Sequence, residues 1–271
     1  MTAGRSRPER PAPPEIDISV PHSARIWNYW LGGKDHYPVD RAAGDAYAAV
    51  FPGIVSIARA QRYFLARAVR YLAGEAGIRQ FLDVGTGLPT RDNTHEVAQR
   101  AAPDARIVYV DNDPLVLTHA RALLTSTPEG ATSYVDADLR DPGRILDAAS
   151  KTLDLGEPVA LILLGVLGHL PDYDEARAIV RHLMDGLAPG SHLALADSTD
   201  TDEAFKQAQR RYNEGGSVPY HLRGRDQIAA FLDGMETVPP GVVVLSRWRP
   251  DLGAPGPVAE EHEVCGVGRK T

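Results

Sequence analysis

Cysteine, excess basic charge and long hydrophobic runs are scarce in this chain, and each shortage excludes a class of protein. The single cysteine, Cys265, excludes an internal disulfide and a multi-cysteine metal site, which fits a reducing cytoplasm. A formal net charge of −7 argues against general polyanion binding, because nucleic-acid affinity depends mainly on Lys and Arg. No run approaches the roughly 18 apolar residues of a membrane span. We therefore expect a cytoplasmic protein that binds neither nucleic acid nor membrane and holds no metal.

Five short apolar runs alternate with amphipathic stretches in the middle of the chain. They are typical of buried strands and cover residues 78–85, 106–113, 132–138, 159–165 and 191–198. Helical patterns lie between them: Asn93 and Glu96 form a capping box, and Pro114 suits a first helical turn. This alternation predicts an α/β fold, a doubly wound Rossmann-like sheet with ligands beyond the carboxyl ends of its strands.

The C-terminal part predicts one strand that runs against the others. Residues 223–234 have the pattern of an amphipathic helix, and residues 241–248 and 262–270 have that of strands. No helix separates these two strands, and a parallel pair would need a crossover, so they must pair antiparallel. The expected sheet is therefore seven-stranded and mostly parallel, with one reversed C-terminal strand.

Small and acidic residues stand at the carboxyl ends of three predicted strands. Asp83, Gly85 and Gly87 lie at or just beyond the end of the first strand, Asp111 near the end of the second and Asp138 at the end of the third. Glycines let a backbone approach a ligand closely, and an acid at the end of the second strand can accept hydrogen bonds from ribose hydroxyls. The spacing indicates a nucleoside-containing ligand.

Two positions argue against a nicotinamide dinucleotide as that ligand. A dinucleotide-binding loop needs a third glycine where this chain has Thr90, preceded by Pro89. Asp83 would repel a pyrophosphate but would attract a ligand that carries an ammonium and a sulfonium. An NAD-dependent oxidoreductase stays open as an alternative.

The pattern D-x-G-x-G, with acids at the ends of the next two strands, resembles the class I S-adenosylmethionine-dependent methyltransferases. The resemblance implies S-adenosyl-L-methionine as cofactor, with loop 83–88 along its methionine part. It implies further that Asp111, with Asn112 beside it, holds the ribose and that Asp138 and Leu139 border the adenine. A non-catalytic protein that binds the same cofactor is a further alternative, because methyl transfer can rest largely on proximity.

Neighbouring acids compete for two of these roles. Asp113 stands close to Asp111 and is placed to cap the helix that begins at Pro114. Asp136 and Asp141 compete with Asp138, and Asp141 is a natural N-cap for the helix that follows.

A closer resemblance comes from the segments PHSARIWNYWLGGKDHYPVDR, DVGTGLPTRDNTHEVAQ and VYVDNDPLVLTHARALL. Together they resemble an S-adenosyl methyltransferase family first catalogued as a domain of unknown function. The likeness runs from about Ile16 to the C-terminus, and its L-G-G-K-D and N-T-H-E blocks are specific to that family. Gln61 stands where the family has asparagine. The resemblance implies a cofactor but defines no methyl acceptor.

We expect three regions along the chain. Residues 1–14 contain four prolines and have the composition of a disordered tail, residues 15–77 form an N-terminal helical cap or lid, and residues 78–271 form the methyltransferase core. Within the cap, the helix over residues 22–31 ends at a Gly-Gly pair. Its aromatic residues either pack on the core or belong to a mobile lid that brings Tyr29 and Lys34 to the ligand.

An arginine from the next helix is placed to meet the cofactor carboxylate. Arg62 is the preferred candidate and Arg59 the second, with surface solvation as the alternative for both.

The loop from Gly165 to His169 follows the fourth strand, and by the same resemblance it faces the methyl group and the acceptor, with Gly165 against the cofactor. His169 is the candidate catalytic base, because its ordinary pKa lies near neutrality. Alternatively it caps the following helix or packs, and Asp197 after the fifth strand is a rival base. With nucleic acid unlikely on charge, we expect a small-molecule acceptor.

Overall fold

The computed structural model describes residues 16–123, 125–251 and 262–271, so the predicted tail over residues 1–14 lies outside the described residues. The α-helices are α1 Ser23–Trp30, α2 Pro38–Val50, α3 Ile54–Gly74, α4 Thr94–Ala101, α5 Pro114–Leu123, α6 Pro142–Ala149, α7 Tyr173–Asp185, α8 Glu203–Glu214 and α9 Arg225–Ala229. The strands are β1 Gln80–Val84, β2 Arg106–Asp111, β3 Ala131–Asp136, β4 Ala160–Leu164, β5 His192–Ser198, β6 Glu236–Thr237, β7 Val243–Val244 and β8 Glu263–Arg269.

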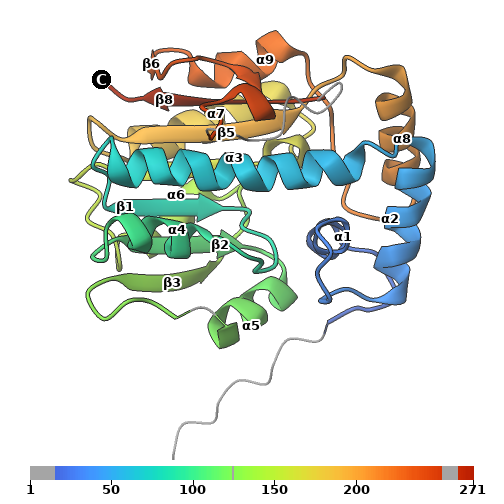
Figure 1. Ribbon diagram of the computed structural model, residues 1–271, viewed down its shortest axis with the longest axis horizontal. Helices are drawn as coiled ribbons and strands as arrows, with labels where there is room; N and C mark the ends of the chain where they lie inside the picture. The colour runs from blue at the N-terminus through green and yellow to red at the C-terminus, as the bar shows by residue number, and fades with distance from the viewer. Residues whose placement is uncertain (1–15, 124, 252–261) are drawn as a thin grey trace, which may run out of the picture.

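The strands form one twisted sheet in the order β3-β2-β1-β4-β5-β8-β6, and β7 also pairs with β8 (Figure 1). The first five are parallel, whereas β8 is antiparallel to β5, β6 and β7. This confirms the predicted doubly wound α/β fold and its reversed C-terminal strand. The carboxyl ends of the parallel strands therefore meet at one edge of the sheet.

Alternate residues of each strand pack on opposite faces of the sheet. Phe81 and Ile107 share a buried core with α3 and α4, whereas Leu82 and Val108 share another with α6 and α7. Both faces of the parallel strands are thus covered, which explains their nearly continuous apolar runs.

The predicted strand over residues 241–248 is wrong in its second half. Only Val243–Val244 pairs with β8, and Leu245–Arg247 form a 3-10 turn. The turn brings Trp248 beneath α3, fully buried, with its ring 5.4 Å from that of Phe64. Burying this large side chain outweighs extending a two-residue edge strand.

Two further boundaries differ from the prediction. The expected helix over residues 223–234 is α9 followed by a separate 3-10 turn, Ala230–Leu232, and the chain then turns at Gly234 with φ 81°. Strand β6 was not predicted. Within the described residues the sheet therefore has eight strands, seven along its main order plus β7.

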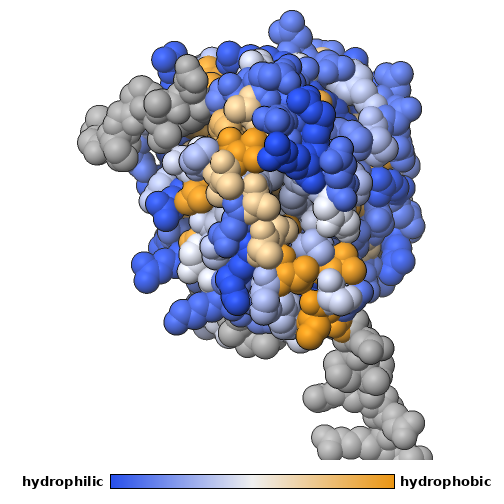
Figure 2. All heavy atoms as spheres, turned by 90° about the vertical axis from the view of Figure 1, so that its right-hand side faces the viewer, coloured by the Kyte–Doolittle hydropathy of each residue, from blue (hydrophilic) through white to orange (hydrophobic). Residues whose placement is uncertain are grey.

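Helices α1, α2 and α8 lie together beyond the carboxyl edge of the sheet, at the right of Figure 1. The surface at this end is mainly hydrophilic, with a narrow band of hydrophobic residues across it (Figure 2). Helix α1 begins after His22, whose Nδ1 accepts from the N–H of Ala24 at 3.4 Å, and the chain turns at Gly32 with φ 79°. None of the helices in the described ranges combines the length and the apolar character needed to span a membrane.

A buried ion pair fixes α1 against α2. The Arg25 guanidinium lies 3.2 Å from the Asp40 carboxylate, and both side chains are at most 4% exposed. Asp40 also accepts hydrogen bonds from the backbone N–H groups of His22 and Tyr37 at 2.9 and 2.8 Å. The carboxylate thus joins the start of α1 to the start of α2.

Candidate active site

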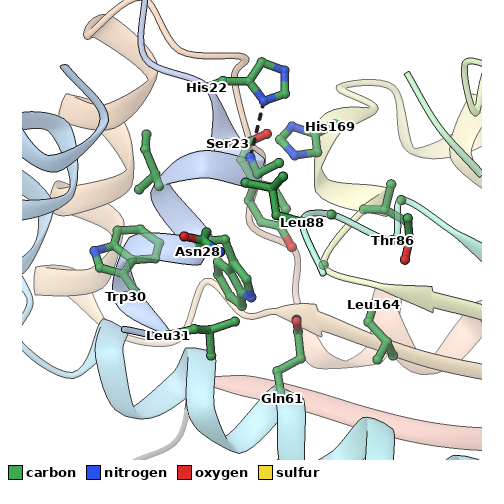
Figure 3. A pocket seen from close by; sticks show the side chains of 18 of the residues that line it. His22, Ser23, Asn28, Trp30, Leu31, Gln61, Thr86, Leu88, Leu164 and His169 are labelled. Carbon is green, nitrogen blue, oxygen red and sulfur yellow. Dashed lines mark hydrogen bonds between the residues drawn. The ribbon is translucent and has the colours of Figure 1, made fainter. Parts of the chain in front are cut away.

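A cavity lies between the carboxyl ends of β1, β2 and β4 and helix α1, with α3 below it in the view of Figure 3. It brings together most of the residues predicted from the sequence. Those lining it are Arg62, Asp83, Gly85, Gly87, Asp111, Asn112, Gly165 and His169.

The loop after β1 exposes its backbone to this cavity. Gly85 and Gly87 have φ values of 74° and 64°, which side-chain-bearing residues rarely adopt. A Cβ at Gly85 would lie 2.5 Å from the Val166 side chain, whereas a Cβ at Gly87 would meet nothing within 4 Å. Gly85 is therefore needed for packing, and Gly87 leaves open space in front of the loop.

Asp111 ends β2 in a fixed orientation. Its two carboxylate oxygens accept from the N–H groups of Gly87 and Asp113, both at 2.9 Å, and the residue is only 8% exposed. Burial raises the pKa of Asp111. Asp113, the competing acid, accepts from the N–H of Leu115 at 2.8 Å and so caps α5, while its other oxygen lies 3.0 Å from His22.

Asp83 is a buried carboxylate at the end of β1. Burial raises its pKa to about 6, against the lowering effects of the Thr94 hydroxyl, which donates to it at 2.6 Å, and of Arg62. Arg62 is held by the carbonyl of Arg91 at 2.9 Å and the amide oxygen of Asn93 at 3.0 Å. Arg59, the second candidate, is exposed to solvent.

Asp138 and Leu139 do not line the cavity. Asp138 is partly exposed and accepts a hydrogen bond at 3.1 Å from Asn112, which does line it. Leu139 packs into the core on the α6 and α7 face. Asp141 caps α6 by accepting from the N–H of Arg144 at 3.1 Å, so it fills the capping role expected of it.

Tyr29 and Lys34 also lie away from the cavity. The Tyr29 hydroxyl donates to Asp45 at 2.6 Å, and its ring packs against His36 with centroids 5.1 Å apart. Lys34 is exposed. The predicted contact of these two residues with ligand finds no support in this arrangement.

His169 lies at the rim of the cavity in a defined tautomer. Its Nδ1 is 2.9 Å from the carbonyl oxygen of Pro219, and because a carbonyl only accepts, Nδ1 carries the proton and Nε2 keeps a lone pair. Burial lowers the pKa of His169, so the ring is neutral at pH 7. Helix α7 is capped by Asp172, which accepts from Glu175 at 2.9 Å, so His169 is not its cap.

Asp197, the rival base, is fully buried at the end of β5. Tyr220 donates its hydroxyl hydrogen to this carboxylate, and an Arg223 nitrogen lies 3.4 Å from its other oxygen. Burial raises the pKa of Asp197 to about 6. Tyr220 lines the cavity, where its ring packs 5.1 Å from that of His169. No sequence motif pointed to Tyr220.

The wall opposite the glycine loop is aromatic, and sequence reasoning missed most of it. Its rings come from three helices: Trp27 and Trp30 from α1, Tyr47 from α2, and Phe205 and Tyr212 from α8. Tyr47 stands at the centre, with ring centroids 5.2 Å from Trp30 and 6.3 Å from Phe205. The i, i+7 spacing of Phe205 and Tyr212 on an amphipathic helix was the available signal.

Comparison with known proteins shows the family of this chain. The family described as S-adenosyl methyltransferase matches residues 9–271. The crystal structure of a DUF574 family protein from Streptomyces avermitilis is 45% identical with a TM-score of 0.91, covering 95% of this chain and 100% of that one. A candidate methyltransferase from Thermobifida fusca is 42% identical with a TM-score of 0.85, covering 94% and 97%. No curated protein matches.

The fold and the glycine-acid loop define a Rossmann-like methyltransferase. The chain belongs to the S-adenosyl methyltransferase family, and it is an enzyme that uses S-adenosyl-L-methionine. The fold extends to distant enzymes: the plantazolicin methyltransferase BpumL is 11% identical with a TM-score of 0.51, covering 92% of this chain and 95% of that one. The NAD-dependent alternative is not favoured.

The residues at the cavity fit this cofactor. Open space lies in front of Gly87, so a ligand can approach the backbone there. Asp83 and Asp111 place two buried carboxylates beside that space, where they complement hydroxyl donors and a positive charge.

Proposed function

We propose that this enzyme methylates a small molecule that enters the cavity between the strand ends and α1, and that it acts in the cytoplasm. The observation that carries the proposal is the aromatic wall from α1, α2 and α8, which faces the glycine loop inside one cavity. Ligand pockets of this kind, mostly apolar with a few convergent polar groups, suit a small organic molecule.

The polar half of the cavity is assigned to the cofactor. Loop 83–88 holds the methionine part, Arg62 meets its carboxylate, Asp111 with Asn112 takes the ribose hydroxyls, and Gly165 lies against it. When bound, S-adenosylmethionine supplies a methyl group on a positively charged sulfur. Asp138 is assigned to the adenine side through its bond to Asn112, with Leu139 beside it.

His169 is proposed as the base that takes a proton from the methyl acceptor. The carbonyl of Pro219 fixes its tautomer, so Nε2 is available to accept, and burial lowers its pKa. A base that is neutral at physiological pH can take up that proton as the acceptor attacks.

The predicted cap over residues 15–77, of which the structure describes 16–77, is proposed to cover the site. Helix α1 lines the cavity, and the Arg25 and Asp40 ion pair fixes it to α2. His22, at the start of α1, also lies 3.0 Å from Asp113 in the loop after β2, which joins the cap to the strand side of the cavity.

The acceptor class is tested by incubating the enzyme with methyl-labelled S-adenosylmethionine and separated fractions of a cell extract. We expect label to appear in the small-molecule fraction and not in protein or nucleic acid. Label confined to a macromolecular fraction would contradict the proposal. The His169→Ala variant, whose turnover should fall, is the matched control for background labelling.

A further inference from the structure

Two fully buried carboxylates lie behind the cavity wall, on neighbouring positions of adjacent strands. Asp197 is on β5 and Glu263 is on β8, and both are 0% exposed. The antiparallel register pairs Ser198 with Glu263 and Asp197 with Val264. Each carboxylate holds a polar side chain that lines the cavity.

Glu263 orients Gln61. The amide nitrogen of Gln61 donates to a Glu263 oxygen at 2.6 Å, within the buried interior. Because the nitrogen is directed to the carboxylate, the amide oxygen is the atom that Gln61 presents to a ligand. Figure 3 shows Gln61 rising from α3 toward the cavity with its oxygen uppermost. Gly165 makes room for it, since a Cβ there would lie 2.8 Å from the Gln61 nitrogen.

Asp197 orients Tyr220 in the same way. The Tyr220 hydroxyl hydrogen is committed to Asp197, so its oxygen can only accept from a ligand. Burial raises the pKa of Tyr220 well above its usual range, and Asp197 and Glu263 add to that effect, so it stays protonated. Ser198 interacts with the same oxygen, and its hydroxyl can rotate away when a ligand binds.

The geometry points to an amino group as the ligand of this wall: we propose that the methyl acceptor is an amine whose N–H groups donate to Gln61 Oε1 and Tyr220 Oη. This rests on the proposed methyl transfer to a small molecule. A primary amine carries two or more donors and can satisfy both oxygens, whereas an alcohol carries one. The aromatic rings of Trp30 and Tyr47 favour a cation with an apolar body.

The transfer then balances with the groups present. His169 takes one proton from the ammonium form, which frees the nitrogen lone pair. The lone pair forms the bond to the methyl carbon as the bond between that carbon and sulfur breaks, and sulfur keeps the electron pair. The product leaves as a methylated ammonium ion, together with S-adenosylhomocysteine.

The cofactor also carries an amino group, so the test must separate the two sources. Titration calorimetry is run with the enzyme saturated with S-adenosylhomocysteine, using tryptamine and benzylamine as amines. Their alcohol counterparts, indole-3-ethanol and benzyl alcohol, have the same aromatic bodies. We expect at least one amine to bind about tenfold or more tightly than its alcohol.

The variants Tyr220→Phe and Gln61→Leu should each weaken amine binding about ten- to hundredfold and leave S-adenosylhomocysteine binding within a few-fold. Because Gln61→Leu removes a donor from buried Glu263, the double variant Gln61→Leu/Glu263→Leu provides a second test if the single variant unfolds. Tyr63→Phe, on the exposed side of α3, is the matched control.

Three results would overturn the proposal. The first is that neither amine binds, and the second is that an alcohol binds as tightly as its amine. The third is that the variants weaken the binding of S-adenosylhomocysteine instead, which would assign the amino group to the cofactor. Failure of wild-type protein to bind S-adenosylhomocysteine at all would contradict the cofactor assignment instead.

Discussion

The two halves of the cavity are built in opposite ways. On the strand side, Gly85, Gly87 and Asp111 offer backbone and carboxylate, and their positions follow from the carboxyl ends of β1 and β2. On the helix side, Trp30 and Tyr47 offer ring faces that belong to the packed core. The strand half is thus a local structure around a loop, whereas the helix half exists only once distant helices have packed. Substitutions in the strand half should therefore change cofactor affinity, and substitutions in the helix half should change stability. Substitution of the proposed base should change turnover.

The largest effect is expected where the halves meet. His169→Ala removes the proposed base, so turnover should fall by ~10² to 10⁴-fold while cofactor affinity stays within a few-fold. Single-turnover kinetics with an amine that the enzyme methylates measure turnover, and calorimetry measures cofactor affinity. His182→Ala, on the exposed side of α7, is the control. Unchanged turnover would assign His169 a structural role.

Substitutions in the helix half should lower the stability of the fold, as substitutions in a hydrophobic core do. Trp30 is 7% exposed and packs edge-on against Trp27 and Tyr47, so Trp30→Ala should lower the free energy of unfolding by about 3 to 5 kcal/mol. Urea denaturation followed by circular dichroism measures it. Ile18→Ala, at a residue 56% exposed, should change stability little. If Trp30→Ala also changed stability little, the aromatic wall would be separate from the core.

Substitutions in the strand half should instead lower the affinity for the cofactor. Asp111→Asn should weaken the binding of S-adenosylmethionine by about 1 to 3 kcal/mol, because the ribose hydroxyls would lose a charged hydrogen-bond acceptor. Asp113→Asn is the matched control: it loosens the cap of α5 and the His22 contact, so it should affect melting temperature more than affinity. If both variants lost affinity equally, the assignment of Asp111 over Asp113 would be wrong.

The smallest expected effect is a pH dependence set by Asp83. Its folded pKa of about 6 lies above the unfolded value of 3.8, so its stabilising contribution is full below pH 3.8 and is lost as pH rises through 6. Cofactor affinity should run the other way and fall about tenfold per pH unit below 6, as the carboxylate is neutralised.

Calorimetry with S-adenosylhomocysteine from pH 5 to 8 measures this profile, and Asp83→Asn should flatten it. An equally steep profile in the variant would assign the titration to another group. Asp111 is then the next candidate for that group, because burial raises its pKa as well.

The strand half of the cavity could be predicted from the sequence. Strand periodicity placed β1 and β2, and the rule that ligands bind beyond parallel strand ends then selected Asp83, Gly85, Gly87 and Asp111. Neighbours along the chain determine each of these positions. The confirmed capping box of Asn93 is local in the same sense.

The helix half depends on contacts that no local pattern encodes. Tyr47 donates its hydroxyl to Gln209 at 3.1 Å across 162 positions of sequence. Gln61 and Tyr220 gain their orientation from carboxylates on β8 and β5, elements that lie far from Gln61 in the chain. Trp248 is a further example. Periodicity predicted a strand through residue 248, but the chain turns at Leu245–Arg247 and buries Trp248 against α3.

A crystal structure of the complex with S-adenosylhomocysteine tests the division of the cavity most directly. We expect the homocysteine part to lie along Gly85 to Gly87 and the ribose hydroxyls to bind Asp111. The sulfur should face the space between His169, Gln61 and the aromatic wall. A ligand whose sulfur faced away from that space, or whose adenosine occupied the rings of Trp30 and Tyr47, would contradict it.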